Sequence, residues 1–336
     1  MMSSILVSRL CCSPSLRLAA ARYAPKNNII VRNFTRNERD TIQKTARKPT
    51  LKEKLMAPAG DSAFKIGKGA LAGGAALGIG ALCFYGLGLS NQAGALEKSA
   101  IWPQFVMDRI KQTYLYFGGS IAITAAAALA SFRSPAIMRL VTSNGPMGFF
   151  VSIAAIMGTG ILCQSIDYSQ GFGPKQMAWL LHAGTMGAVL APMCYLGGPL
   201  LMTAAWYTVG VVGGLSTIAV CAPSEKFLMM GGPLAMGLGV VFASSIGSAF
   251  LPATSALGAG LYSVSLYGGL LLFSAFLLYD TQRIIAQAER YPTSPALYGV
   301  RPYDPINSAL SIYMDTLNIF IRIVSIMTGA GGNRKR

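Results

Sequence analysis

Charge is scarce in this sequence. Only 12% of its 336 residues are charged, whereas 53% are hydrophobic and the mean hydropathy is +0.49. A soluble globular domain carries about 25% charged residues, so the composition excludes an ordinary water-soluble domain. Acids are the scarcest group, with 12 Asp and Glu against 28 Lys and Arg. The chain is expected to be an all-α protein that crosses a bilayer several times.

Paired cysteine motifs are absent and histidine is nearly so. The six cysteines are Cys11, Cys12, Cys83, Cys163, Cys194 and Cys221, with no CxxC spacing. This pattern excludes a disulfide framework and a cysteine metal site. The single histidine, His182, can relay a proton near neutral pH or, as is commoner for a lone helical histidine, hydrogen-bond a neighbouring helix.

Eight hydrophobic stretches have about the 20 residues that a transmembrane helix needs. They cover residues 66–90, 114–132, 147–166, 177–196, 199–221, 228–251, 257–285 and 306–328. The sequence therefore predicts eight membrane-spanning helices.

The N-terminal segment has a different composition. Up to Arg36 it contains six basic residues, no acid and scattered Ser and Ala, which is typical of a mitochondrial transit peptide, and it has no secretory hydrophobic region. Arg32 stands three positions before Thr35, so we expect cleavage between Phe34 and Thr35, with 1–34 as the transit peptide. Residues 35–65 are polar and basic and are expected to form a solvated arm in the matrix.

Positive charges outside the spans are unevenly distributed. The N-terminal side collects Arg36, Arg39, Lys44, Arg47, Lys48, Lys52, Lys54, Lys65, Lys68, Arg133, Arg139, Arg334, Lys335 and Arg336. The opposite side holds Lys98, Arg109, Lys111, Lys175, Lys226, Arg283, Arg290 and Arg301. The positive-inside rule then places both termini in the matrix. Import and topology account for the net charge of +16, and no motif indicates a nucleic-acid partner.

The last hydrophobic stretch carries a polar stripe. Its members, spaced three or four residues apart on one helical face, are Ser308, Ser311, Asp315, Asn318, Arg322 and Ser325. A carboxylate at the bilayer centre costs about 3 kcal/mol, so the stripe should face the inside of a bundle. Asn318 either completes the polar shell of Asp315 or bridges helices. Arg322 either pairs with Asp315 or extends to the matrix surface.

Asp280 is the expected partner of Asp315. The seventh stretch can remain helical until Pro292 stops it, and the eighth begins with Asp304 as N-cap and Pro305 as its first helical residue. Each acid then lies about ten residues, or about 15 Å, from the loop between the two helices. Antiparallel packing would bring the carboxyl groups side by side.

Two neighbouring carboxyl groups in a poorly hydrated place cannot both be charged at low cost, so such a pair tends to hold one proton. When both are ionised, Asp280 and Asp315 offer the hard oxygen ligands that Ca²⁺ accepts. Protons and Ca²⁺ should therefore compete for the pair as transported or gating ions, without a resident cofactor. The sequence leaves open whether the flux is a leak or an exchange, and the oligomeric state.

The segments around both acids resemble the closing signatures of the transmembrane Bax inhibitor (lifeguard) family. They are residues 272–285, which include Leu-Tyr-Asp-Thr-Gln-Arg-Ile-Ile at 278–285, and residues 311–320, Ser-Ile-Tyr-Met-Asp-Thr-Leu-Asn-Ile-Phe. The segment from His182 to Pro192 resembles the glycine-rich third helix of that family. The similarity runs from about residue 66 to the end of the chain.

The resemblance implies a seven-helix core at 114–328, preceded by an additional transmembrane helix at 66–90 and an intermembrane-space linker at 91–113, and followed by a basic tail at 329–336. It also implies that Asp280 and Asp315 form a pH-sensitive pair that controls calcium passage. Some members pair the acids with an arginine near the second core helix, where Arg133 and Arg139 lie in this chain.

A mitochondrial member of the family is associated with calcium and proton exchange in the inner membrane and with cristae organisation. We therefore expect a mitochondrial inner-membrane calcium/proton exchanger or pH-gated calcium leak. Its expected partners are the bilayer, Ca²⁺ and other inner-membrane proteins.

Two other functional classes share features of this sequence. A scaffold that supports cristae and binds partner proteins would not need the acids. An intramembrane aspartyl protease also uses two aspartates on adjacent helices, and Tyr279-Asp280 matches half of its signature, but the segment before Asp315 lacks the required Gly-x-Gly. A rhomboid-type serine protease is disfavoured because the segment around Ser216 lacks the second glycine of that motif. No enzyme is expected.

Overall fold

The structure is a computed structural model that describes residues 50–58, 62–86, 94, 98–99, 101–142, 146–223, 225–252, 254–292 and 302–332. The cleavage site predicted between Phe34 and Thr35, most of the basic arm and residues 333–336 of the tail lie outside these ranges. By its contacts the chain divides into two units, Met1–Leu55 and Met56–Arg336.

The described end of the basic arm contains a short helix, α3 (Leu51–Met56). The backbone N–H of Thr50 donates to the Glu53 carboxylate at 2.7 Å, and the N–H of Glu53 donates to the Thr50 hydroxyl at 3.3 Å. This reciprocal capping box satisfies two N–H groups that a helix start leaves free. No residue of α3 is buried.

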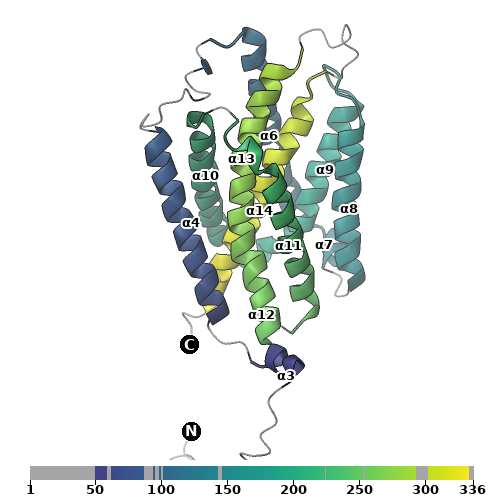
Figure 1. Cartoon of the computed structure of the whole chain (residues 1–336). Helices are drawn as coiled ribbons and strands as arrows, with labels where there is room; N and C mark the ends of the chain where they lie inside the picture. The colour runs from purple at the N-terminus through teal and green to yellow at the C-terminus, as the bar shows by residue number, and fades with distance from the viewer. Residues whose placement is uncertain are drawn as a thin grey trace, which may run out of the picture. The chain divides into compact units, whose positions relative to one another are not determined.

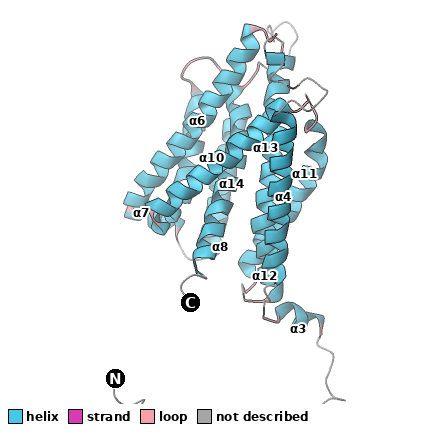
Figure 2. Cartoon of the chain, turned by 90° about the vertical axis from the view of Figure 1, so that its left-hand side faces the viewer, coloured by secondary structure: helices cyan, strands magenta, loops and turns pink. Residues whose placement is uncertain are grey.

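The second unit is a bundle of helices (Figures 1 and 2). In chain order they are α4 (Ser62–Gly86), α6 (Gln104–Arg133), α7 (Pro135–Val141), α8 (Pro146–Ser165), α9 (Pro174–Leu190), the 3₁₀ turn η1 (Ala191–Leu196), α10 (Gly198–Cys221), the 3₁₀ turn η2 (Leu228–Met230), α11 (Gly231–Phe250), α12 (Ala256–Ser263), the π-helical segment η3 (Val264–Gly268), α13 (Gly269–Arg290) and α14 (Pro305–Gly332). The described ranges contain no strand, only two isolated bridges. The fold is all-helical, which lets each segment satisfy its own backbone hydrogen bonds in lipid.

Within the described ranges, seven helical segments are long and apolar enough to cross a membrane. They are Phe64–Tyr85, Gln104–Arg133, Pro174–Leu196, Gly198–Cys221, Leu228–Phe250, Ala256–Arg290 and Pro305–Gly329. The chain is therefore a multi-pass membrane protein. The expected span at 147–166 corresponds to α8, whose apolar part, Phe150–Ser165, is shorter than the other seven.

The direction of its neighbours requires α8 to run the length of the bundle. Trp102, just before α6, donates a hydrogen bond to the last turn of α13, and Lys175 at the start of α9 pairs with Asp304 before α14. Both α6 and α9 thus start at the end of the bundle where α13 connects to α14. At the other end of α6, Phe132 packs against Tyr195 in η1, just beyond α9. The chain must return between α6 and α9, and α8 is that returning segment (Figure 1).

Helix α14 lies in the middle of the bundle, where it packs against α13, α6 and α10. Its fully or nearly fully buried apolar residues are Ile306, Ala309, Leu310, Ile312, Tyr313, Leu317, Ile319 and Val324. The predicted start of this helix is confirmed, because the backbone N–H groups of Ile306 and Asn307 both donate to Oδ1 of Asp304 at 2.9 Å.

One close approach joins α6, α9 and α14. A Cβ on Gly187 of α9 would lie 2.5 Å from the backbone oxygen of Thr124 on α6, so only glycine allows this separation. The Thr124 hydroxyl lies 3.2 Å from the Ala183 carbonyl oxygen, to which it donates, and 2.5 Å from the Tyr313 hydroxyl on α14. These contacts fix the central helix against two neighbours.

Helix α6 begins ten residues earlier than expected, so residues 104–113, assigned to the linker from sequence, are its first turns. Arg109 in these turns donates hydrogen bonds to the backbone oxygens of Ala288, Tyr291 and Pro292 at 2.7–3.0 Å. Carbonyl groups at a helix end have no partner within the helix. Arg109 therefore caps α13 from a neighbouring helix.

Candidate ion-binding site

The two acids predicted to meet are in contact. Asp280 on α13 and Asp315 on α14 are 6% and 5% exposed, and their carboxyl groups are within hydrogen-bonding contact of each other. An ionised carboxylate can only accept hydrogen bonds. A hydrogen bond between the two groups therefore requires a proton on one of them.

The surroundings of the two acids differ. Asp280 is also in contact with the Ser311 hydroxyl, and its Oδ1 lies 3.8 Å from Nη1 of the half-exposed Arg283. Asp315 has a buried oxygen, Oδ2, with no hydrogen-bond partner among the described residues. Asp280 is thus better suited to carry the negative charge, and Asp315 is better suited to carry the proton.

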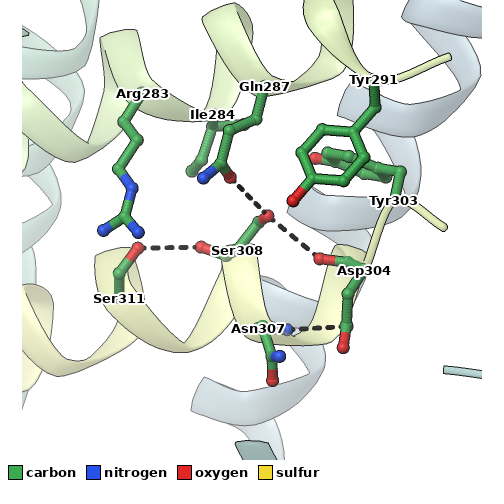
Figure 3. A pocket seen from close by; sticks show the side chains of 9 residues that line it. All are labelled: Arg283, Ile284, Gln287, Tyr291, Tyr303, Asp304, Asn307, Ser308 and Ser311. Atoms are coloured by element: carbon green, nitrogen blue, oxygen red, sulfur yellow. Dashed lines mark hydrogen bonds between the residues drawn. The ribbon is translucent and has the colours of Figure 1, made fainter. Parts of the chain in front are cut away.

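A polar cavity of about 200 Å³ adjoins the pair on the side of the α13–α14 loop (Figure 3). It is lined by Arg283, Ile284, Gln287, Tyr291, Tyr303, Asp304, Asn307, Ser308 and Ser311. Arg283 and Ser311 both line the cavity and both contact Asp280, so the acid pair lies at its inner end. Figure 3 shows the Arg283 guanidinium beside Ser311.

A buried cation closes the loop side of this region. Lys175 is fully buried, its Nζ lies 2.7 Å from Oδ2 of Asp304, and it donates to the Ile166 carbonyl at 2.9 Å and to Oδ1 of Asn307 at 2.8 Å. From sequence Lys175 counted as a loop cation. Nothing in the sequence around Lys175 indicates that its side chain contacts Asp304 and Asn307 at the start of α14.

Tyr303 also belongs to this end of the cavity. Its hydroxyl lies 2.7 Å from that of Thr113 on α6, and the Arg109 guanidinium lies 5.5 Å from its ring centre. Burial raises the pKa of Tyr303, so its phenol stays neutral and hydrogen-bonded near pH 7. The sequence offered no spacing signal for Thr113 or Tyr303.

His182 lies away from the cavity lining. Its Nδ1 is 3.0 Å from the Thr159 hydroxyl on α8, and its ring packs edge-on against Tyr313 at 6.3 Å. It makes the hydrogen bond to a neighbouring helix that is the commoner of the two interpretations.

Within the described residues Arg322 forms no ion pair with Asp315. Its Nη1 donates to the Asn318 carbonyl at 3.0 Å and to the Asn318 side chain at 2.9 Å, and its Nε donates to the Ser265 carbonyl in η3 at 3.3 Å. It thus bridges two helices, and its extension toward the matrix surface stays a prediction. Asn318 accepts a hydrogen bond from Arg322 and donates one to the Met314 carbonyl, and within the described ranges its hydrogen bonds do not include Asp315. The π-helical segment, which sequence did not predict, supplies the carbonyl that holds Arg322.

Arg133 and Arg139 do not approach the acids. Both are exposed, in the last turn of α6 and in α7, at the opposite end of α6 from the start of α14. Within the described ranges, the cation that forms an ion pair with the acid pair is Arg283, one turn along the helix of Asp280.

The donor atoms suit a passing cation. The described residues contain no group of three or more His, Cys, Asp or Glu side chains that could hold a metal. Asp280, Asp315 and Ser311 nevertheless place carboxylate and hydroxyl oxygens together, and Oδ2 of Asp315 lacks a partner. Ca²⁺ accepts six to eight oxygen ligands in flexible geometry and can complete its shell with water. Such a set fits a substrate ion.

A buried acid pair between the last two spans of a helical bundle defines a class of multi-pass membrane protein with a polar centre. The family described as "Inhibitor of apoptosis-promoting Bax1" matches residues 106–333, from α6 to the end of α14. The chain belongs to this family of Bax inhibitor proteins.

Individual relatives agree. The chain is 59% identical over 289 residues to the growth hormone-inducible transmembrane protein of Rattus norvegicus, covering 85% of this chain and 82% of that protein. It is 27% identical over 240 residues to an uncharacterized protein of Helicobacter pylori, covering 69% and 90%. It is also 27% identical over 215 residues to Bax inhibitor 1 of Oryza sativa subsp. japonica, covering 62% and 78%.

Proposed function

We propose that this protein moves Ca²⁺ across the mitochondrial inner membrane under the control of protons, as an exchanger or a pH-gated leak, through Asp280 and Asp315. The observation that carries the proposal is the contact between these two buried carboxyl groups at the inner end of a polar cavity. Carboxyl groups so close exchange a proton for a divalent cation because both processes use the same oxygens.

The different surroundings of Asp280 and Asp315 support different roles for the two acids in the proposed transport. Asp280, in contact with Arg283 and Ser311, remains the anion, and Asp315 holds the proton that links the two groups. Ca²⁺ reaches the pair through the cavity. When Asp315 loses its proton, the cation gains a second carboxylate ligand. Return of the proton removes one charge and releases the cation.

The proposed topology has eight crossings and both termini in the matrix. The family match starts at residue 106, which supports the proposal that α4 is an additional N-terminal span before a seven-helix core. The run of α8 between α6 and α9 supports the count of eight. The N-terminal composition supports mitochondrial import, which N-terminal sequencing of the mature protein tests: an intact Met1 or Met2 contradicts removal of a transit peptide. Carbonate extraction of mitochondria tests membrane insertion.

The function is tested with purified protein in liposomes that contain a calcium-sensitive dye, under imposed pH gradients. Asp280→Asn and Asp315→Asn should each lower proton-dependent Ca²⁺ flux at least tenfold, because an amide does not exchange a proton for a cation. Asp108→Asn, at an exposed acid on α6, is the matched control and should transport like wild type. If the two buried variants transport normally, the acid-pair mechanism is wrong and a scaffold role in cristae is favoured.

A further inference from the structure

Asp315 is not the only charged residue on the polar face of α14, because the partly buried Arg322 lies on the same face. Arg322 follows Asp315 by seven residues, or about 10 Å along the helix. It lies ten residues before the end of α14 at Gly332, so a cation that leaves the pair along this face, away from the cavity, encounters Arg322. The proposed function uses no group at this position.

The π-helical segment η3 supplies a backbone acceptor for the Arg322 guanidinium. In an α-helix the carbonyl of Ser265 would accept from the N–H of Gly269, but in η3 the Gly269 N–H bonds to Val264 and Leu266. The Ser265 carbonyl accepts from Nε of Arg322 instead. The register shift of the π-helix therefore provides the acceptor.

Two further contacts fix the position. A Cβ on Gly269 would lie 2.1 Å from Nε of Arg322, so glycine makes room for the guanidinium. The guanidinium carbon also lies 4.6 Å from the ring centre of Phe273, a distance at which the ring face attracts a cation. The Ser265 hydroxyl in turn lies 2.6 Å from that of Ser245 on α11. Arg322 is thus held between α14 and η3, with α11 behind.

Among the residues that the structure describes, no acid forms an ion pair with Arg322. Its hydrogen-bond partners are the Asn318 amide and carbonyl oxygens and the Ser265 carbonyl. The ion pairs of the described residues involve Lys175, Arg283 and Arg290. An arginine remains protonated in proteins, and the field of a partly buried charge is screened less than that of a fully exposed one. A divalent cation on the pair is therefore repelled from the side of Arg322.

We propose that Arg322 is the inner electrostatic barrier of the ion path, a specificity-determining residue that prevents Ca²⁺ bound at the acid pair from passing freely toward the C-terminal end of α14. The proposal rests on the proposed function. In this proposal the cation binds the acid pair from the side of the cavity, and Arg322 blocks the opposite side.

The test measures Ca²⁺ flux in liposomes without a pH gradient. Arg322→Gln removes the charge but keeps a side chain that can donate to Ser265, and it should raise this flux on the order of tenfold. Arg322→Lys keeps the charge and should remain within about twofold of wild type. Adding Asp315→Asn to the Gln variant should abolish the added flux, because the cation still passes the acid pair. A merely structural Arg322 predicts the opposite, with both single variants losing flux and thermal stability together.

A second pair of variants leaves Arg322 in place. Ser325→Glu puts a carboxylate one turn further on the same face, where it compensates the guanidinium, and should also raise the gradient-independent flux, while Ser325→Gln should not. The barrier is refuted if Arg322→Gln and Ser325→Glu both stay at the wild-type flux while Asp280→Asn and Asp315→Asn abolish transport. If those two acid variants have no effect, the proposed function itself fails.

Discussion

The buried ion pair between Lys175 and Asp304 gives a quantitative prediction for stability. Lys175 is 0% exposed in its side chain and Asp304 is 19% exposed, and the two are 2.7 Å apart. Lys175→Met keeps a similar volume but leaves the carboxylate without its cation and the Ile166 carbonyl without its donor. Removing one partner of a buried pair costs about 3–5 kcal/mol. Because Asp304 is partly hydrated, we expect about 3 kcal/mol.

The measurement is the thermal unfolding midpoint in detergent, supported by the free energy of unfolding in bicelles. At roughly 2–4 °C per kcal/mol, Lys175→Met should lower the midpoint by about 6–12 °C. Arg290→Gln is the exposed comparison. It breaks the ion pair between Arg290 and Glu225, in which the two side chains are 63% and 57% exposed, and should lower the free energy of unfolding by about 1 kcal/mol or less.

A double variant separates charge from packing. Adding Asp304→Asn to Lys175→Met removes the unpaired carboxylate while Asn still serves as the N-cap of α14, so part of the lost stability should return. The reasoning is refuted if Lys175→Met destabilises no more than Arg290→Gln.

Two further predictions concern packing. Gly187→Val should lower the unfolding midpoint by several degrees, because a Cβ at this position would lie 2.5 Å from the Thr124 backbone oxygen. Gly184→Val is the control and should change the midpoint little, because no atom lies within 4 Å of a Cβ there. Equal effects of the two variants would show that α6 and α9 do not pack so closely. Gln282→Leu should lower the free energy of unfolding by about 3 kcal/mol. The buried Gln282 amide donates to the Ala219 and Pro223 carbonyls and accepts from the N–H of Phe227. An unchanged free energy of unfolding would contradict this arrangement.

Local signals predicted the elements around the acid pair. The Asp304 cap, the proline at the first helical position and Pro292 after α13 fixed the depth of both acids, because helix ends depend on neighbouring residues and the rise per residue is constant. The spacing of the polar stripe placed Asp315 on an inward face for the same reason. The contact between Asp280 and Asp315 followed from these two depths.

Long-range partners could not be predicted in this way. Lys175 and Arg109 look like loop cations in the sequence, but each is bound by groups more than 120 residues away in the chain. The partner of Arg322 depends on a π-helical turn, which changes backbone hydrogen bonding without a distinctive residue pattern. Arg133 and Arg139 were candidates only through the family resemblance, and their place near the opposite end of α6 follows from how the helices pack.

The sequence by itself determined that the chain is a helical membrane protein with an acid on each of its last two spans, because hydropathy, helical periodicity and helix ends are local properties. Only the tertiary structure decided which groups surround those acids. Arg283 and Ser311 adjoin Asp280, Lys175 neutralises Asp304, and Arg322 is held on η3. Those choices depend on how helices distant in sequence pack, and the strength of each charge interaction depends on the burial that this packing creates.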